Sequence, residues 1–161
     1  MRSFKVVALV TALMVAASAS AELPVSPLGD IYQSYNDCFK VATKEGIKPE
    51  VLGSLGWSRA TVSNDGKPVA NGPIIYGNAK RAPIILLSAE KGEGLCIVMA
   101  RLESTKAFDD FKGAWGGKLP PPGADGNIVF FAEGHAIMLK QTESAQKPTM
   151  TIAVMTTMEK K

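Results

Sequence analysis

The stretch IVFFAEGHAIMLK at residues 128–140 determines the fold class, because it predicts a β-hairpin. Two apolar runs, 128–132 and 135–140, flank Glu133-Gly134, and a two-residue link ending in glycine is typical of a tight hairpin turn. Residues 149–157 then alternate strictly between two faces, with Met150, Ile152 and Val154 on one and Thr149, Thr151 and Ala153 on the other. This alternation predicts a strand with one buried face and one face that is wet or thinly covered.

Upstream of this hairpin, the sequence predicts further strands. Residues 84–88 and 95–102 are continuous apolar runs, and the segment EKGEG at 90–94 links them. Such runs fit the middle of a sheet covered on at least one face, and the glycine-containing link favours an antiparallel hairpin. Shorter strands are expected at 57–62 and 74–76, with a turn at Asn64-Asp65-Gly66 between them.

Three segments have the spacing of amphipathic helices. In 28–42, apolar residues recur at steps of three and four; Ser26 is the expected cap, Pro27 the first helical residue and Gly46 the stop. A short helix is expected at 49–55. Ser104 is the expected cap of a third helix, whose inner face carries Ala107, Phe108, Phe111 and Trp115. The segment 116–127, with four glycines and three consecutive prolines, is predicted to be a loop.

Together these elements predict one α+β domain over residues 22–161. The strands follow one another largely as hairpins, so we expect a mostly antiparallel sheet of about six to seven strands, with two or three helices packed on one face. A helix followed by three strands occurs twice in this order. No residue-level repeat supports a duplication, and the question of a true repeat stays open.

The N-terminal 21 residues have the three parts of a cleavable signal peptide. Arg2 and Lys5 give a positive start, residues 6–17 are apolar apart from Thr11, and Ala19-Ser20-Ala21 supplies the A-x-A ending before Glu22. The apolar run is shorter than the roughly 20 residues that span a bilayer. We expect cleavage after Ala21 and export to a bacterial periplasm, with secretion to the exterior as the alternative. An uncleaved anchor or a buried strand is the competing interpretation.

Removal of the signal leaves a nearly neutral protein. The whole chain has 18 basic and 15 acidic residues; without Arg2 and Lys5, 16 basic residues remain, for a net charge of +1. This balance does not favour a nucleic-acid partner, which requires a basic surface. No second hydrophobic stretch follows, so no membrane span is expected after cleavage.

The two cysteines, Cys38 and Cys96, both lie in the predicted mature part. In an oxidising compartment we expect them to form a disulfide that joins the inner face of the first helix to a central strand. The loop closed would be about 60 residues long, which the chain-entropy account values at about 4 kcal/mol. Buried free thiols are the alternative. A redox pair usually has C-x-x-C spacing, which is absent.

Residue types that carry catalysis are sparse. His135 is the single histidine, and with Glu133 two residues earlier it could form a proton-transfer site, although the intervening turn could separate the two side chains. An ordinary position at the hairpin edge is the interpretation we favour. One histidine and two paired cysteines cannot build a zinc site, and no motif indicates a cofactor.

Aromatic residues at the ends of elements are the remaining candidates for a binding surface. Trp57, Tyr76 and Trp115, with His135, could line a ligand pocket or anchor a partner, although such residues more often complete a small core. The sequence thus favours an exported, non-enzymatic protein that binds a partner protein, an envelope component or a small ligand. The alternative is a periplasmic enzyme using carboxylates near Glu133 and His135.

Overall fold

The computed structural model describes residues 22–69, 72–142, 144 and 146–157. The predicted signal peptide, residues 1–21, lies outside this range. The helices are α1 (Leu28–Val41), α2 (Glu50–Ser54) and α3 (Thr105–Gly113). The main sheet contains β3 (Trp57–Arg59), β6 (Ile74–Asn78), β7 (Arg81–Leu87), β8 (Leu95–Arg101), β9 (Ile128–Ala132), β10 (His135–Gln141) and β11 (Thr149–Met155). Two small hairpins are β1 (Ala42–Thr43) with β2 (Gly46–Ile47), and β4 (Ser63–Asn64) with β5 (Lys67–Pro68).

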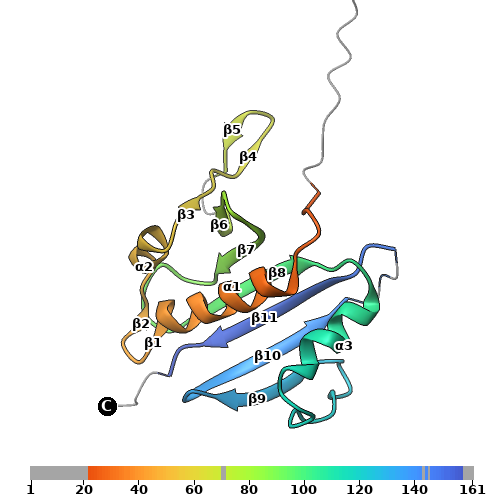
Figure 1. Ribbon diagram of the computed structural model, residues 1–161. Coiled ribbons are helices and arrows are strands. Elements are labelled where there is room, and N and C mark those ends of the chain that lie inside the picture. Colours follow the sequence, from red (N-terminus) through yellow and green to blue (C-terminus); the bar gives the residue numbers. More distant parts are fainter. Residues whose placement is uncertain (1–21, 70–71, 143, 145, 158–161) are drawn as a thin grey trace, which may run out of the picture.

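The seven strands form one antiparallel sheet in the order β3-β6-β7-β8-β11-β10-β9. Chain neighbours pair as hairpins, except that α3 and the following loop carry the chain from β8 to β9, and β11 then inserts between β8 and β10. Helices α1 and α3 lie on the same side of this sheet (Figure 1). The α+β architecture, with helices on one face of a mostly antiparallel sheet, is confirmed.

The core lies between α1 and the central strands. Ile31, Cys38 and Val41 on the inner face of α1 are all 0% exposed. They face the strands β7, β8 and β11, whose inward residues include the fully buried Ile85, Val98 and Val154. Each such aliphatic side chain contributes about 1.5–3 kcal/mol of hydrophobic stabilisation, so this layer is the main support of the domain.

The start of α1 differs from the prediction. Pro27, not Ser26, occupies the N-cap position, and no side chain caps the helix. Ser26 instead continues the extended N-terminal segment, where its backbone amide donates to the carbonyl of Arg101 at 2.8 Å. Its buried hydroxyl has no hydrogen-bond partner. Because Ser26 pairs with β8, it does not cap α1, although the local sequence favours it as the cap. The predicted cap of α3 is confirmed, since the Ser104 side chain accepts from the amide of Ala107.

Strand β7 begins earlier than predicted, at Arg81, and includes Pro83. Proline cannot donate to a sheet ladder, so it is tolerated here because the pairing of β6 with β7 shifts register between Tyr76 and Asn78. Asp30 of α1 accepts from the amide of Ala82 in this irregular stretch at 3.3 Å. At the sheet edge, β3 is shorter than the predicted 57–62 and ends at Arg59.

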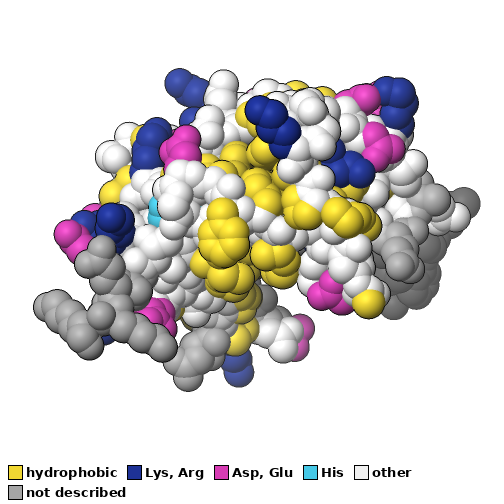
Figure 2. Space-filling model, turned by 90° about the horizontal axis from the view of Figure 1, so that it is seen from below, with side chains coloured by type: hydrophobic (Ala, Val, Ile, Leu, Met, Phe, Trp, Pro, Cys, Tyr) yellow, Lys and Arg dark blue, Asp and Glu magenta, His cyan; other side chains and the backbone are white. Residues whose placement is uncertain are grey.

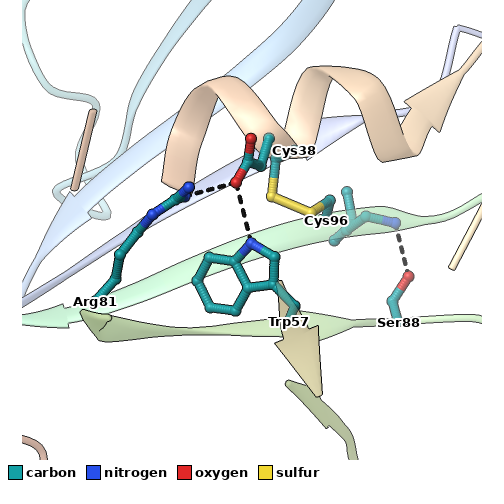
Figure 3. Close-up of a disulfide and its surroundings, with 7 residues drawn as sticks. Cys38, Trp57, Arg81, Ser88 and Cys96 are labelled. Carbon is teal, nitrogen blue, oxygen red and sulfur yellow. Dashed lines mark hydrogen bonds and ion pairs between the residues drawn. A yellow bond between two sulfur atoms is a disulfide. The ribbon is translucent and has the colours of Figure 1, made fainter. Parts of the chain in front are cut away.

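The predicted disulfide is confirmed. Cys38 of α1 and Cys96 of β8 are bonded with Cα atoms 5.4 Å apart, and both residues are 0% exposed (Figure 3). The bond therefore joins the helix layer to the middle of the sheet. Within the described residues, no helix has the length and apolar character needed to cross a membrane.

Candidate functional site

The four residues predicted to line a binding site divide between two halves of the sheet. Trp57 on β3 and Tyr76 on β6 are core residues, 3% and 7% exposed. Trp115, just after α3, and His135, at the start of β10, are half-buried at the other end. Strands β3 and β9 are the opposite edges of the sheet, so the two pairs do not share one pocket.

Trp57 belongs to a buried polar cluster centred on Asp37 of α1. One carboxylate oxygen of Asp37 accepts from the Trp57 indole nitrogen at 3.0 Å and from the Arg81 guanidinium at 2.6 Å (Figure 3). The other oxygen accepts from Lys40 at 3.3 Å. Asp37 is 4% exposed, and Arg81 also lies over the Trp57 ring. The cluster joins α1, β3 and β7 through charge-assisted hydrogen bonds.

The environment of Asp37 keeps its carboxyl group ionised. Burial alone would raise the pKa, but the hydrogen bonds from Trp57, Arg81 and Lys40, with the charge of Arg81, outweigh burial and hold the pKa below its ordinary value. A general acid or base requires a pKa near the working pH. Asp37 therefore stays charged at neutral pH, where it holds the Trp57 and Arg81 side chains against α1.

Trp115 and His135 belong to an aromatic cluster on the helix-covered side of the sheet. Tyr32 stacks on Phe111 at 4.5 Å between centroids, and Trp115 packs edge-on against Tyr35 at 6.1 Å and Phe130 at 5.6 Å. The Tyr32 hydroxyl donates to the carbonyl of Phe111 at 2.6 Å. Edge-to-face and offset stacked rings stabilise each other beyond their buried area, so this cluster fastens α3 and β9 to α1.

His135 has fixed partners on two sides. Its Nδ1 lies 2.8 Å from the carbonyl oxygen of Met155, and because a carbonyl only accepts, Nδ1 carries the hydrogen. The ring packs edge-on against Phe39. Glu133 lies in the hairpin turn, with a φ of 51°. Its negative charge acts on Tyr35 of α1: burial of the Tyr35 hydroxyl, together with the charge of Glu133, raises the pKa of Tyr35 to about 12. His135 therefore stabilises the pairing of β10 with β11 through its hydrogen bond to Met155.

One cavity beside the described strands lies away from all of these residues. It has a volume of about 560 Å³ and lies beside the β4–β5 hairpin, with the Arg59–Glu90 ion pair, 2.7 Å apart, among its walls. Among the described residues, no group of three or more histidine, cysteine or acidic side chains could hold a metal ion.

A separate apolar feature is the side of the sheet that carries no described helix, which we call the open face. Strand alternation and register place on it the residues that alternate with the core positions of each strand. Its apolar members are Ile75, Ile84, Leu86, Leu95, Ile97, Met99, Val129, Phe131, Ala136, Met138, Ala153 and Met155.

Exposure on the open face rises toward strand β9. Val129 and Phe131 are 52% and 80% exposed, the two highest values among the described large hydrophobic residues. Seen from the β9 side, hydrophobic side chains gather in a patch across the middle of the molecule, while most charged side chains lie around its margins (Figure 2). Contiguous apolar surface of this kind is typical of interaction sites.

The charges of the sheet are all basic. None of its seven strands contains an aspartate or glutamate. Two basic residues fall on the open face, Lys140, which is exposed, and Arg101, which pairs with Glu22 at 2.9 Å. The open face thus combines apolar side chains with weak positive charge.

Comparison with known proteins gives no relative: no family model matches the chain, and no curated protein or solved structure matches it significantly. The site must therefore be judged from its own geometry.

Sequence reasoning missed both Asp37 and the extent of the open face. Asp37 was detectable, since it lies three residues after Ser34 and four before Val41, on the inner side of a helix where a charge requires a partner. The open face was only partly detectable. Alternation in β11 indicated a thinly covered side, but continuous apolar runs such as 95–102 resemble strands buried on both faces.

Proposed function

We propose that the mature chain is an exported binding protein that docks an apolar, acidic-rimmed surface of another envelope protein on its open face. The observation that carries this proposal is the apolar open face of an otherwise well-packed domain. The side chains of Ile97, Met99 and Met138 lie on the open face and are partly exposed. The aromatic cluster, in contrast, packs against the core on the other side of the sheet. A soluble protein exposes a broad apolar surface at a cost, which a partner removes by covering it.

The shape and charge of the open face favour a protein partner over a small ligand. Small-molecule sites are concave pockets that enclose the ligand, whereas a sheet face offers a broad surface for many side chains. The charge of Lys140 favours acidic groups around the partner's apolar centre, whereas Arg101 is already paired with Glu22. The buried disulfide is compatible with an oxidising compartment, and the A-x-A segment supports export.

The enzyme alternative receives less support from the geometry. A histidine that acts as a general base needs a free ring nitrogen within reach of the reacting group, and a carboxylate commonly orients it. The Nδ1 of His135 donates to the carbonyl of Met155, which leaves Nε2 free, but among the described residues no hydrogen bond or ion pair joins His135 to Glu133 or to another carboxylate. We expect His135→Ala to leave partner binding unchanged.

Site-specific photo-crosslinking in the producing cells tests the proposed surface. A photoreactive amino acid at position 99, on the open face, should give a discrete protein adduct. The same amino acid at Asn36, on the solvent side of α1, serves as the control and should give none. Adducts with lipid only, with a second copy of this chain, or equally from both positions would contradict the proposal. The intact mass of the protein from the periplasmic fraction should correspond to a start at Glu22; an uncleaved chain would contradict export.

A further inference from the structure

Strand β9 leaves its outer edge without a backbone partner among the described residues. Glu133 and Gly134 both have positive φ, 51° and 82°, as in a type I′ turn, so Ala132 and His135 form a hydrogen-bonded pair. Hydrogen-bonded and non-hydrogen-bonded pairs alternate along an antiparallel ladder. The amide and carbonyl groups of Val129 and Phe131 therefore point outward from the sheet.

This edge lacks the features that prevent strands from pairing between molecules. Exposed edges are usually short, charged or interrupted by proline. The opposite edge fits that rule, because β3 has only three residues and includes Arg59. Strand β9 has five residues, IVFFA, with no charge and no proline, and its exposed Val129 and Phe131 are both apolar.

We infer that a second copy of this chain pairs with β9, antiparallel, about a twofold axis at Phe130. In this register Val129 of each copy lies opposite Phe131 of the other. These are the residues whose backbone groups point outward, so the two symmetric pairs use all of them. The paired Val129 and Phe131 side chains also lie on one face and cover each other, a favourable aromatic and β-branched cross-strand contact.

The charges flanking β9 are compatible with this self-pairing. The strand itself carries no charge, and in this register Ala132 of one copy lies opposite Ile128 of the other. The charge that follows the strand, Glu133 in the turn, therefore lies at the end of the paired segment that is nearest the uncharged Asn127 of the other copy. No like charges meet along the paired segment, so this edge is compatible with the self-complementary patch that an isologous interface uses. The sheet would become continuous across both copies, and the open face would double in extent. This inference does not depend on what covers the open face at Met99.

Sedimentation of the mature, disulfide-bonded protein from about 1 µM to about 1 mM tests the inference, because that range covers weak specific association. The protein should shift from monomer to dimer with concentration. Val129→Lys should weaken dimerisation at least about tenfold, since it places a charge in the apolar seam. Val69→Lys is the matched control, because Val69 is similarly exposed, 42% against 52%, and lies near the other end of the sheet; it should leave dimerisation unchanged.

A third variant separates strand pairing from apolar contact. Val129→Pro removes an amide that points outward and leaves the ladder to β10 intact, so the fold should persist while dimerisation is lost. Circular dichroism and thermal unfolding check the fold of each variant. A protein that stays monomeric throughout, equal effects of Val129→Lys and Val69→Lys, or a folded Val129→Pro variant that still dimerises would overturn the inference.

Discussion

At the scale of single residues, the main polar determinant of the fold is Asp37. It is a buried carboxylate held by an indole, a guanidinium and an ammonium group from three elements. Removing one partner of such a buried pair is far more costly than removing an exposed one, because it leaves the other charge without compensation. The cluster therefore fixes where β3 and β7 lie relative to α1.

We expect Asp37→Asn to lower the free energy of unfolding by about 3 kcal/mol at neutral pH. This is the low end for a broken buried pair, because the Arg81 side chain retains 19% exposure to water. Asp109→Asn, at an exposed ion pair with Lys112, is the matched control and should cause no measurable change. Chemical denaturation of both variants measures the difference; equal stabilities would contradict the role given to Asp37.

We also expect the destabilisation caused by Asp37→Asn to depend on pH. The folded state holds the pKa of Asp37 below its unfolded value, so the stabilisation is fully present above the ordinary aspartate pKa of about 3.9 and is lost as pH falls through the folded value. The stability difference between wild type and Asp37→Asn should be constant above about pH 5 and shrink below about pH 4. A stability difference that grew on acidification would show that folding raises the pKa of Asp37 and would contradict this prediction.

At the scale of elements, the disulfide joins the helix layer to the sheet. Because both cysteines are fully buried, the bond cannot be reached by reductant without opening the core. Its separation of 58 residues gives it a large effect on the unfolded chain, about 4 kcal/mol. It supports the contact of α1 with β8 and β11, on which the one-sided arrangement depends.

We expect the double variant Cys38→Ala/Cys96→Ala to lose about 2–5 kcal/mol of stability while keeping its secondary structure under mild conditions. Asp37→Asn provides the comparison, because the two changes weaken the same layer by different means. Alkylation of the wild type, unfolded without reductant, should find no free thiol. Two reactive thiols, or an unchanged denaturation midpoint in the double variant, would contradict this account.

Elements defined by local periodicity could be predicted from the sequence, whereas their tertiary adjustments could not. The hairpin at Glu133-Gly134, the cap at Ser104 and the pairing of Cys38 with Cys96 all follow from short-range chemistry or elimination. The start of α1 and the bulge near Pro83 depend on distant partners, Arg101 and Asp30. Strand order also depends on the insertion of β11 between β8 and β10, which no local pattern specifies.

The candidate site was less predictable than the fold. Trp57 and Tyr76 were assigned to a binding surface because aromatic residues at element ends are frequent anchors, but both lie in the core. The open face has no motif, because it arises from the side chains of strands that are distant in sequence. Only the topology shows that Ile97, Met99 and Met138 share a side without a helix.

At the scale of the whole molecule, the two sides of the sheet are unequal. One side holds the helices, the disulfide and both tryptophans, and the other holds partly exposed aliphatic residues and methionines. A single layer of helices on one face is sufficient for folding, because α1 and the inward residues of β7, β8 and β11 already form a dry core. The other side is then not required for the core, and the proposed edge pairing at β9 would enlarge it.

The most direct test of the open face is methionine oxidation in the native, dilute protein, followed by peptide mass spectrometry. Met99 and Met138 lie on the open face, whereas Met150, 0% exposed, lies on the helix-covered face of β11 and serves as the internal control. Oxidation by peroxide follows exposure, so Met99 and Met138 should react at least about tenfold faster than Met150, and all three should react equally after unfolding. Native Met99 and Met138 as slow as Met150 would mean that this side of the sheet is covered, and would contradict the account.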